Sequence, residues 1–352
     1  MTTKIPNIIH QVWIGDKPAP IKLMETWKNK HPNYEYIFWN EQEFQNRNII
    51  FECQEKIDLI QEINGKADII RWELLWKYGG VFIDADSICI EPLDSYFDGN
   101  TAFASFENEQ VRPGLVATGT MGFLPNHPLC RDIIDWIKSD ESTEMILQKQ
   151  AWVSVGPGLL TRFLNTGKYK DFSVYPSHVF LPVHFQGDPY LGHKKIYAHQ
   201  YWGSNYQLYD SMYFSQTNIF ELPESLKPPE KWVSLILILS DITKIRECLH
   251  SIKLQKGRFG IEMIIINDEY IPDLEKELEI FIKTSRFIKL FYNRVFEKQN
   301  YENYVRLGKI VSTGTFVFLM DTTFIMPYDY LQKQIEILGK KEDIRISESD
   351  II

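Results

Sequence analysis

The sequence lacks long apolar runs, closely spaced cysteines and any excess of basic residues. Its longest apolar runs, such as residues 233–239, fall far short of the roughly 20 residues that a membrane-spanning helix needs. The four cysteines lie far apart without a Cys-X-X-Cys pair, which argues against a zinc site or a disulfide framework and is typical of a reducing compartment. The net charge of -9 argues against a nucleic-acid partner held by phosphate neutralisation. We therefore expect a cytoplasmic protein with no transmembrane segment.

The composition is that of a globular protein with more than one domain. Hydrophobic residues make up 44% and charged residues 24% of the 352-residue chain, and at roughly 150 residues per domain the length suggests about two domains. A polar stretch with three prolines predicts a linker at 222–232, between a first domain at 1–221 and a second at 233–352. Acidic and basic residues balance in 231–352, so the acidic excess lies in the first domain.

Strand and helix patterns alternate in both parts of the chain. In the first part, apolar residues at helical spacing run from Ala67 to Tyr78, Gly79 and Gly80 end the helix, and 81–84 reads as a short buried strand. The second part predicts strands at 233–239, 261–266 and 316–321 and a helix at 243–253. This alternation indicates the α/β class, with a site at the carboxyl ends of the strands.

Acidic side chains gather around the end of the strand at 81–84. Asp84 and Asp86 are two residues apart, so in an extended segment both carboxylates face one side, where they suit Mg²⁺ or Mn²⁺. Asp68 and Arg71 are three apart on the preceding helix and hence on one face, near the acidic loop. The alternatives for these pairs are a solvated turn and a surface salt bridge.

Together these motifs resemble a known family. The segments 5–13, 33–36 and 67–86 closely resemble the family 32 glycosyltransferases, sugar-transferring proteins with a DXD motif, here Asp84-Ala-Asp86. The segments 121–128, 156–158 and 199–204 fit later parts of that pattern, so the resemblance covers roughly residues 5–205. It implies a GT-A fold, an α/β sheet that binds a nucleotide-sugar at the carboxyl ends of its strands.

The resemblance also implies roles for individual side chains. Trp13 would stack on the base of the donor, while Asp68 and Arg71 would contact the donor sugar and phosphate. Asp84 would touch the ribose or the metal, and Asp86 would be the main metal ligand. Asp84, Asp86 and Arg71 are therefore the predicted catalytic residues.

A later segment of the pattern would complete the site. The resemblance implies that His199 joins the metal shell and that Trp202 and Ser204 hold the phosphates. Here Ser204 is followed by Asn205, with the tryptophan two residues earlier, whereas the family usually has Ser-Trp.

The predicted function is a metal-dependent glycosyltransferase that uses Mn²⁺ or Mg²⁺ and a UDP- or GDP-linked sugar. Its acceptor would be a glycan, a lipid-linked glycan or a protein, and the resemblance implies retention at the anomeric carbon. A lipid-linked acceptor is compatible with peripheral membrane contact.

One alternative is a non-catalytic protein that binds nucleotide-sugars or carbohydrate. Another is a phosphohydrolase of the haloacid-dehalogenase type with Asp84 as nucleophile, although the Tyr78-Gly79-Gly80 turn is atypical of that family. The donor sugar, the base, the acceptor and the oligomeric state stay open.

The second part resembles the nucleotide-binding half of family 2 glycosyltransferases. The strands at 233–239 and 261–266, the helix between them and the strand ending at Asp321 follow that pattern in order. Thr322 and Thr323 stand where a second acidic residue is expected, so we predict a partial, non-catalytic module.

Overall fold

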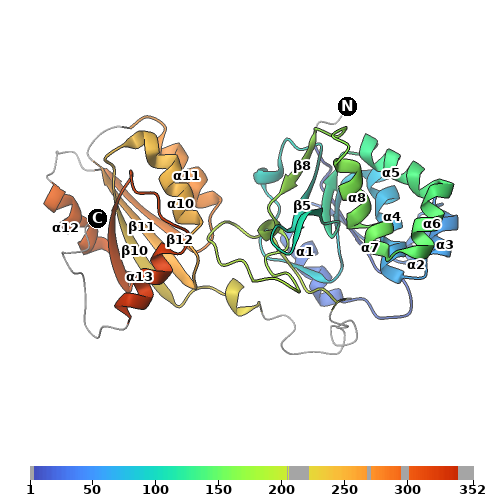
Figure 1. Ribbon diagram of the computed structural model, residues 1–352, viewed down its shortest axis with the longest axis horizontal. Coiled ribbons are helices and arrows are strands. Elements are labelled where there is room, and N and C mark those ends of the chain that lie inside the picture. Colours follow the sequence, from blue (N-terminus) through green and yellow to red (C-terminus); the bar gives the residue numbers. More distant parts are fainter. Residues whose placement is uncertain (1–3, 204, 206–221, 268–270, 295–300, 340–352) are drawn as a thin grey trace. The chain divides into compact units, whose positions relative to one another are not determined.

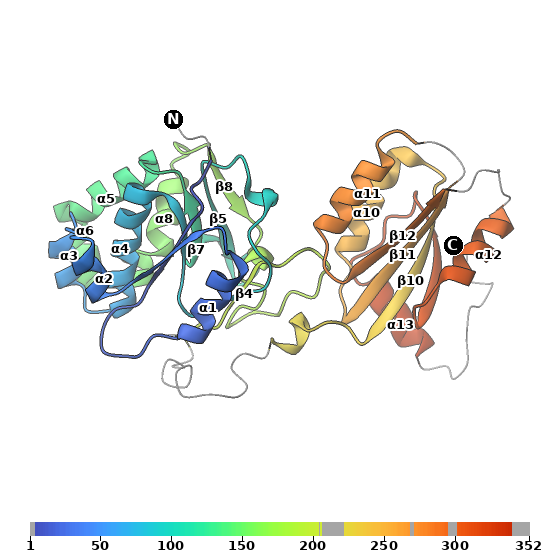
Figure 2. The same ribbon diagram turned by 180° about the vertical axis from the view of Figure 1, so that it is seen from behind.

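The computed structural model describes residues 4–203, 205, 222–267, 271–294 and 301–339, which fall into two compact units (Figures 1 and 2). Unit 1 comprises residues 1–189 and 196–221, and unit 2 comprises 190–195 and 222–352. Residues 190–195, which the sequence analysis placed in the first domain, thus pack with the second unit. The predicted linker at 222–232 also belongs to unit 2 and contains a short 3₁₀ helix, Glu224–Leu226.

Unit 1 is built on a seven-stranded sheet with the order β2-β1-β3-β7-β5-β6, and β8 pairs with β5. Its strands are β1 (Ile8–Val12), β2 (Glu35–Trp39), β3 (Gly80–Ile83), β5 (Ala102–Asn108), β6 (Arg112–Val116), β7 (Thr120–Phe123) and β8 (Phe172–Tyr175). β1 pairs in parallel with β2 and β3, whereas β7 is antiparallel to both β3 and β5. β1, β2, β3 and β5 therefore run in the same direction and end at one edge of the sheet. A separate ladder joins β4 (Ser87–Cys89) to β9 (Ala198–Gln200).

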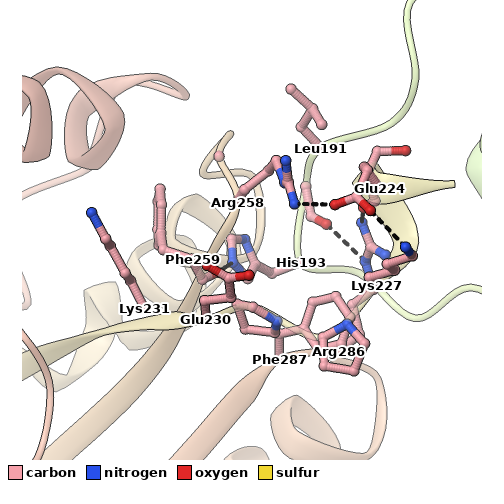
Figure 3. A pocket seen from close by; sticks show the side chains of 15 residues that line it. Leu191, His193, Glu224, Lys227, Glu230, Lys231, Arg258, Phe259, Arg286 and Phe287 are labelled. Carbon is pink, nitrogen blue, oxygen red and sulfur yellow. Dashed lines mark hydrogen bonds and ion pairs between the residues drawn. The ribbon is translucent and has the colours of Figure 1, made fainter.

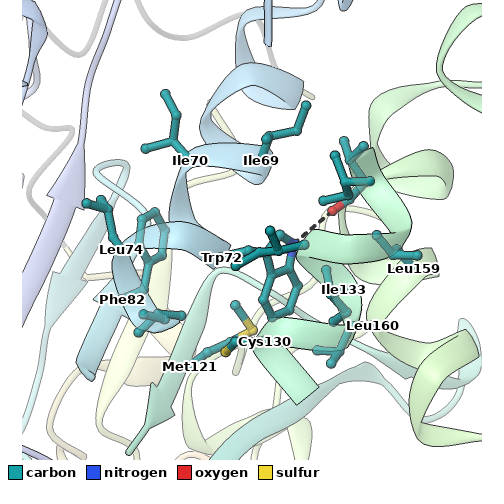
Figure 4. Close-up of a cluster of buried hydrophobic side chains, with 14 of the residues drawn as sticks. Ile69, Ile70, Trp72, Leu74, Phe82, Met121, Cys130, Ile133, Leu159 and Leu160 are labelled. Carbon is teal, nitrogen blue, oxygen red and sulfur yellow. Dashed lines mark hydrogen bonds between the residues drawn. The ribbon is translucent and has the colours of Figure 1, made fainter. Parts of the chain in front are cut away.

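Apolar side chains on the two faces of this sheet form two cores. The helices of unit 1 are α1 (Ile21–Lys30), α2 (Glu41–Asn46), α3 (Gln54–Leu59), α4 (Ile63–Tyr78), α5 (Pro128–Lys138), α6 (Asp140–Gln148), α7 (Ala151–Ser154) and α8 (Pro157–Leu164). Side chains of α4, α5 and α8 form the larger core with one face of the sheet, while Trp27 of α1 packs with Val81 and Phe103 on the other. Figure 4 shows Trp72 of α4 between Ile69, Ile133 and Leu160, and its indole Nε1 donates to the Val155 carbonyl at 3.1 Å. The predicted α/β class is confirmed.

The predicted helix, glycine turn and strand are confirmed at residues 63–83. Helix α4 is buried on several sides, and the backbone N–H of Gly79 closes it by donating to the Leu75 carbonyl at 2.9 Å. Gly79 has a φ of 64°, and a Cβ there would lie 2.7 Å from the backbone nitrogen of Pro125. The chain therefore needs glycine at this position both for its backbone angle and for its close approach to the segment after β7.

We expect Gly79→Ala to destabilise unit 1 by about 3 kcal/mol or more, because left-handed strain adds to a clash with backbone that cannot move aside. Gly167→Ala is the matched control, since Gly167 has a φ of 71° but nothing within 4 Å of the added Cβ. That change should cost only about 1 kcal/mol. Urea unfolding followed by tryptophan fluorescence measures both, because every tryptophan except Trp232 lies in unit 1. Equal losses for the two variants would show that the close approach at Gly79 is unimportant.

Unit 2 contains a four-stranded parallel sheet with the order β12-β11-β10-β13. Its strands are β10 (Lys231–Ile238), β11 (Phe259–Asn267), β12 (Ile288–Arg294) and β13 (Phe316–Asp321). Its helices are α10 (Ile245–Lys253), α11 (Leu274–Lys283), α12 (Tyr301–Val311) and α13 (Tyr330–Leu338). Side chains of α10, α11 and α13 pack on one face of the sheet and those of α12 on the other. The strands and the helix predicted here are confirmed, whereas Asp268 and Glu269 after β11 lie outside the described residues.

Two further expectations concern cysteines and membrane helices. All four cysteines are buried and carry free thiols. Within the described ranges, no helix combines the length and the apolar character that crossing a membrane requires.

Candidate active site

The parallel strands of unit 1 bring the predicted site residues to one edge of its sheet. Trp13 follows the carboxyl end of β1, and Asp84 follows that of β3, the strand beside it. The side-chain amide of Gln11 on β1 donates to the main-chain carbonyl of Asp84 at 3.3 Å. Glu107 lies near the carboxyl end of β5 at the same edge. Polar side chains from three strands therefore gather where open α/β sheets generally bind ligands.

Arg71 of α4 joins Asp68 and Asp84 in one buried cluster. Its Nη2 lies 2.7 Å from Oδ1 of Asp68 and 3.2 Å from Oδ1 of Asp84, and its Nη1 donates to the Thr118 carbonyl. The guanidinium carbon lies 4.4 Å from the ring centroid of Phe82. The side chains of Arg71 and Asp68 are only 6% and 8% exposed, so this arrangement is not the surface salt bridge that the sequence left as an alternative.

Two glycines let the backbone approach the cluster closely. The main-chain N–H of Asp84 donates to the Gly119 carbonyl at 2.7 Å, and a Cβ on Gly119 would lie 2.7 Å from Oδ2 of Asp84. A Cβ on Gly156, which begins the Gly-Pro-Gly motif, would lie 2.7 Å from Oδ2 of Asp68. Larger residues at either position would push against a carboxylate.

Asp86 is buried and accepts hydrogen bonds from a strand more than a hundred residues away. Its Oδ1 accepts from Nε2 of Gln200 at 2.6 Å, and its Oδ2 accepts from the backbone N–H of Gly203 at 2.7 Å. The main-chain N–H of Tyr201 donates to the Asp86 carbonyl at 2.8 Å. Asp86 therefore holds the end of β9 beside the acidic loop.

The cluster carries more negative than positive charge. Burial raises the pKa of Asp68 to about 7, partly offset by the Arg71 guanidinium. The pKa of Asp86 is raised to about 6 by burial and by the negative charge of Asp84, while the hydrogen bonds from Gly203 and Gln200 oppose the shift. Two carboxylates on one guanidinium, with a third carboxylate two residues along the chain at Asp86, favour the binding of a cation.

His199 lies on β9 opposite Ile88, with its ring 4.7 Å from that of Tyr201. Its Nδ1 is buried and has no hydrogen-bond partner among the described residues, and burial lowers the pKa of the ring to about 4. Its neighbour Gln200 makes the contact to Asp86 instead. Within the described part of the chain, no three His, Cys, Asp or Glu side chains form a group that could hold a metal ion. The three predicted metal ligands, Asp84, Asp86 and His199, therefore do not form such a group.

The two predicted tryptophans are held by hydrogen bonds from their own indoles. Nε1 of Trp13 donates to the Lys17 carbonyl at 2.6 Å, and the ring is half-buried. Trp202 has a φ of 54°, and its Nε1 donates to the Val183 carbonyl at 2.8 Å, so this N–H already has an acceptor within the protein. Ser204 lies outside the described residues.

Sequence reasoning missed a second polar group, centred on Glu107. This side chain is 6% exposed, and its Oε1 lies 3.1 Å from Nη1 of Arg112 and 3.1 Å from Nε2 of His184. The guanidinium of Arg112 lies 4.8 Å from the ring of Trp152, while His184 packs 5.0 Å from Trp202. These contacts link the loop around Trp202 to the helix before Gly156. No local pattern marks Glu107, because its importance depends on the order of strands in the sheet.

Comparisons with known proteins place these residues in context. Residues 19–103 match the family described as the glycosyltransferase sugar-binding region containing a DXD motif. Inositol phosphoceramide mannosyltransferase 2 of Schizosaccharomyces pombe is 29% identical over 164 residues, which are 44% of this chain and 44% of that protein. Alpha-1,4-N-acetylglucosaminyltransferase of Homo sapiens is 26% identical over 148 residues, which are 41% of this chain and 38% of that protein.

A solved structure named PaToxG glycosyltransferase is similar to part of this chain, with a TM-score of 0.39 and 17% sequence identity. The matched region is 47% of this chain and 70% of the chain in that structure. The chain spans less than half the length of the two curated relatives. The likeness of unit 2 to family 2 enzymes stays a prediction. The match of residues 19–103, which include Asp84 and Asp86, confirms the resemblance seen in the motifs: this part of the chain is similar to the DXD-containing, family 32-type glycosyltransferases.

Proposed function

We propose that unit 1 is a GT-A glycosyltransferase that moves a sugar from a UDP- or GDP-linked donor to a glycan, a lipid-linked glycan or a protein. The observation that supports this most directly is the buried Asp68–Arg71–Asp84 cluster beside Asp86, at the carboxyl edge of a parallel sheet. Such an edge is where α/β sheets bind nucleotides, and the match to a DXD sugar-binding region includes all four residues.

The acidic loop fits a divalent cation that is shared with the donor. Mg²⁺ is commonly held by one or two carboxylates together with substrate phosphates, so a group of three protein ligands is not required. Asp84 and Asp86 would supply the carboxylate oxygens, and the side chain of Asp84 is 29% exposed and within reach of a ligand. The choice between Mn²⁺ and Mg²⁺ stays open, and His199 as a further ligand stays a prediction. When bound, the cation would offset the negative charge of the diphosphate.

The protein side chains would divide the remaining work. Sugar transfer breaks the bond between the anomeric carbon and the phosphate oxygen, forms a bond to the acceptor oxygen and releases the acceptor proton. Arg71 would stabilise the negative charge that grows on the departing diphosphate, and Asp68 would hold Arg71 in position or accept a sugar hydroxyl. Trp13 would stack on the base. Retention at the anomeric carbon is the outcome that we expect from the family resemblance.

The relatives differ in the sugar that their names specify, mannose in one and N-acetylglucosamine in the other, so the donor has to be found by assay. The test is a panel of UDP- and GDP-sugars with Mn²⁺, scored by nucleotide release, alongside the change in melting temperature with UDP or GDP plus Mn²⁺. Slow donor hydrolysis without acceptor would distinguish an enzyme from a protein that only binds nucleotide-sugars. Absence of any thermal shift with either nucleotide would contradict the proposal.

Phosphatase activity that is lost in Asp84→Asn but kept in Asp68→Asn would support the phosphohydrolase alternative.

Metal binding should weaken as the pH falls. Because the pKa of Asp86 is raised to about 6 and that of Asp68 to about 7, protons compete with the cation below neutral pH. We expect the apparent affinity for Mn²⁺ in the presence of nucleotide to fall by up to about tenfold per pH unit below pH 6. Titrations of Mn²⁺ from pH 5 to pH 8 measure this, and an affinity that does not change with pH would contradict it.

The apo protein should show the opposite trend. Both carboxyl groups have a higher pKa in the folded protein than in the unfolded chain, so the folded state binds more protons between about pH 4 and pH 7. Their contribution to stability is therefore largest at low pH and is lost as the pH rises through this window. Nucleotide and metal should restore it at pH 8.

A further inference from the structure

Unit 2 contains a cavity of about 260 Å³ at the amino-terminal edge of its parallel sheet (Figure 3). Lys231 and Phe259 begin β10 and β11, and Phe287 directly precedes β12. The segments 191–193 and 224–230 complete the wall. Open α/β sheets bind their ligands at the carboxyl ends of the strands, so this cavity is distinct from the place where a family 2-like module would bind a nucleotide.

Cationic side chains dominate the lining of this cavity. Lys227, Lys231, Arg258 and Arg286 face it, against only Glu224 and Glu230. Glu224 is engaged twice, because its Oε2 lies 2.5 Å from Nη2 of Arg258 and its Oε1 lies 2.6 Å from Nζ of Lys227. Figure 3 shows this carboxylate between the two cations. The cavity therefore keeps a positive charge even when both carboxylates are ionised.

Arg286 forms no ion pair with any described residue. Its Nε donates to the Gly192 carbonyl at 3.1 Å, and its Nη2 donates to the carbonyls of Tyr190 and Ser225 at 3.3 and 3.4 Å. These bonds leave Nη1 without an acceptor in the described part of the chain. Burial lowers the pKa of Arg286 to about 10, and among the described residues the group that opposes the shift is Tyr190 and not a carboxylate. A desolvated charge without a counterion is costly, so an anionic group in the cavity would stabilise it.

A hydroxyl group beside Arg286 also lacks a partner. Oγ of Ser225 is buried and forms no hydrogen bond to the described residues. A buried hydroxyl normally has a partner, because leaving one unsatisfied costs free energy. The guanidinium without a counterion and the unsatisfied hydroxyl both belong to the cavity wall, and both are groups that bind a phosphate oxygen.

We propose that this cavity binds the phosphate group of a small phosphorylated compound, with Arg286, Arg258 and the Ser225 hydroxyl as its contacts. The fork of an arginine matches the geometry of phosphate oxygens. The volume lies just below the range of roughly 300–1,000 Å³ typical of ligand pockets, which suits a sugar phosphate better than a whole nucleotide-sugar. Glu224 competes with the phosphate for Arg258, so ligand binding would displace it.

The test is calorimetry on the full chain in EDTA, with inorganic phosphate and glucose 6-phosphate as probes, and sedimentation with vesicles that contain phosphatidic acid. We expect saturable binding of at least one probe, weaker by about tenfold in Arg286→Gln and tighter by about tenfold in Glu224→Gln. Tighter binding in Glu224→Gln is a result that a purely structural role would not produce. Ser225→Ala provides a second variant in case Arg286→Gln unfolds, because its hydroxyl bonds to no described residue.

The vesicle experiment distinguishes two possible sources of the bound phosphate group, a lipid headgroup and a soluble sugar phosphate. Binding to phosphatidic acid vesicles but not to glucose 6-phosphate would identify the phosphate as that of a lipid headgroup, and the reverse would identify a soluble sugar phosphate. Asp86→Asn is the matched control in unit 1 and should bind every probe like the wild type. A failure of phosphate binding in unit 2 can therefore be distinguished from a failure of the proposed transferase function in unit 1. Absence of saturable binding to all three probes, or unchanged binding in both Arg286→Gln and Glu224→Gln, would overturn the proposal.

Discussion

Replacing Asp86 with asparagine should lower the rate of sugar transfer by on the order of 1,000-fold. Asparagine keeps the size of the side chain but removes its negative charge and one acceptor oxygen. Its amide group would also face Nε2 of Gln200 or the backbone N–H of Gly203, both of which are donors. Nucleotide release with a saturating donor and Mn²⁺ measures the loss of rate, and the thermal shift with nucleotide and Mn²⁺ should disappear with it.

The matched control for this change is Asp321→Asn. Asp321 ends β13, a strand in the parallel sheet of unit 2, and its Oδ1 accepts from the backbone N–H of Thr323 at 2.7 Å. It therefore resembles the acidic loop of unit 1 in lying at the carboxyl end of a parallel strand, but Thr323 stands where that loop has its second carboxylate. Transfer should be unchanged in Asp321→Asn. Full activity in Asp86→Asn would exclude the acidic loop as the metal site, and loss of activity in Asp321→Asn would show that unit 2 takes part in catalysis.

Replacing Arg71 with methionine should abolish transfer and also destabilise unit 1 by about 3–5 kcal/mol at neutral pH. The change removes the positive charge but leaves Asp68 and Asp84 in place, and the side chain of Asp68 is only 8% exposed. The pKa of Asp68, which burial already raises, would then rise further, because the guanidinium that opposes the shift is gone. Protonation would relieve part of the cost, so the loss of stability should be smaller at pH 5 than at pH 8.

Arg131→Met serves as the control for charge removal. Arg131 on α5 pairs with Glu52 at 2.8 Å and with Asp135 at 2.7 Å, but its side chain is 27% exposed. Water screens such a pair, so we expect a loss of at most about 1 kcal/mol and unchanged activity. Urea unfolding at both pH values compares the two variants. A loss for Arg71→Met no larger than that for Arg131→Met would show that the buried cluster contributes little to stability.

The sequence predicted the helix, the glycine turn and the acidic loop because every signal for them is local. Asp68 and Arg71 share a helix face through their spacing alone, and the glycines end the helix so that the strand returns beside it. The α/β class and the strands of unit 2 followed from periodicity in the same way. The prediction did not extend to the partners of Asp86. Gln200 and Gly203 meet its carboxylate only because β9 pairs with β4 in a particular register.

The tertiary structure also decided where three other groups lie. Glu107 reaches the site edge because β5 runs parallel to β3 with β7 between them, an order that depends on how the cores on both faces of the sheet pack. Residues 190–195 belong to unit 2, where both ring nitrogens of His193 face carbonyls, of Gln255 at 3.0 Å and of Phe259 at 2.7 Å. The cavity around Arg286 likewise joins segments distant in the chain.

The sequence alone therefore determined the class of fold, the relationship to DXD glycosyltransferases and the Asp68–Arg71–Asp84 cluster. The class of fold follows from local helix and strand patterns and the relationship from short motifs, while the cluster joins residues less than twenty positions apart, which helix geometry and a tight turn bring together. The environment of Asp86, the position of Glu107 and the cationic cavity of unit 2 were decided only by the tertiary structure. They depend on strand order and register, which are set by the packing of the whole core and by no short segment of sequence.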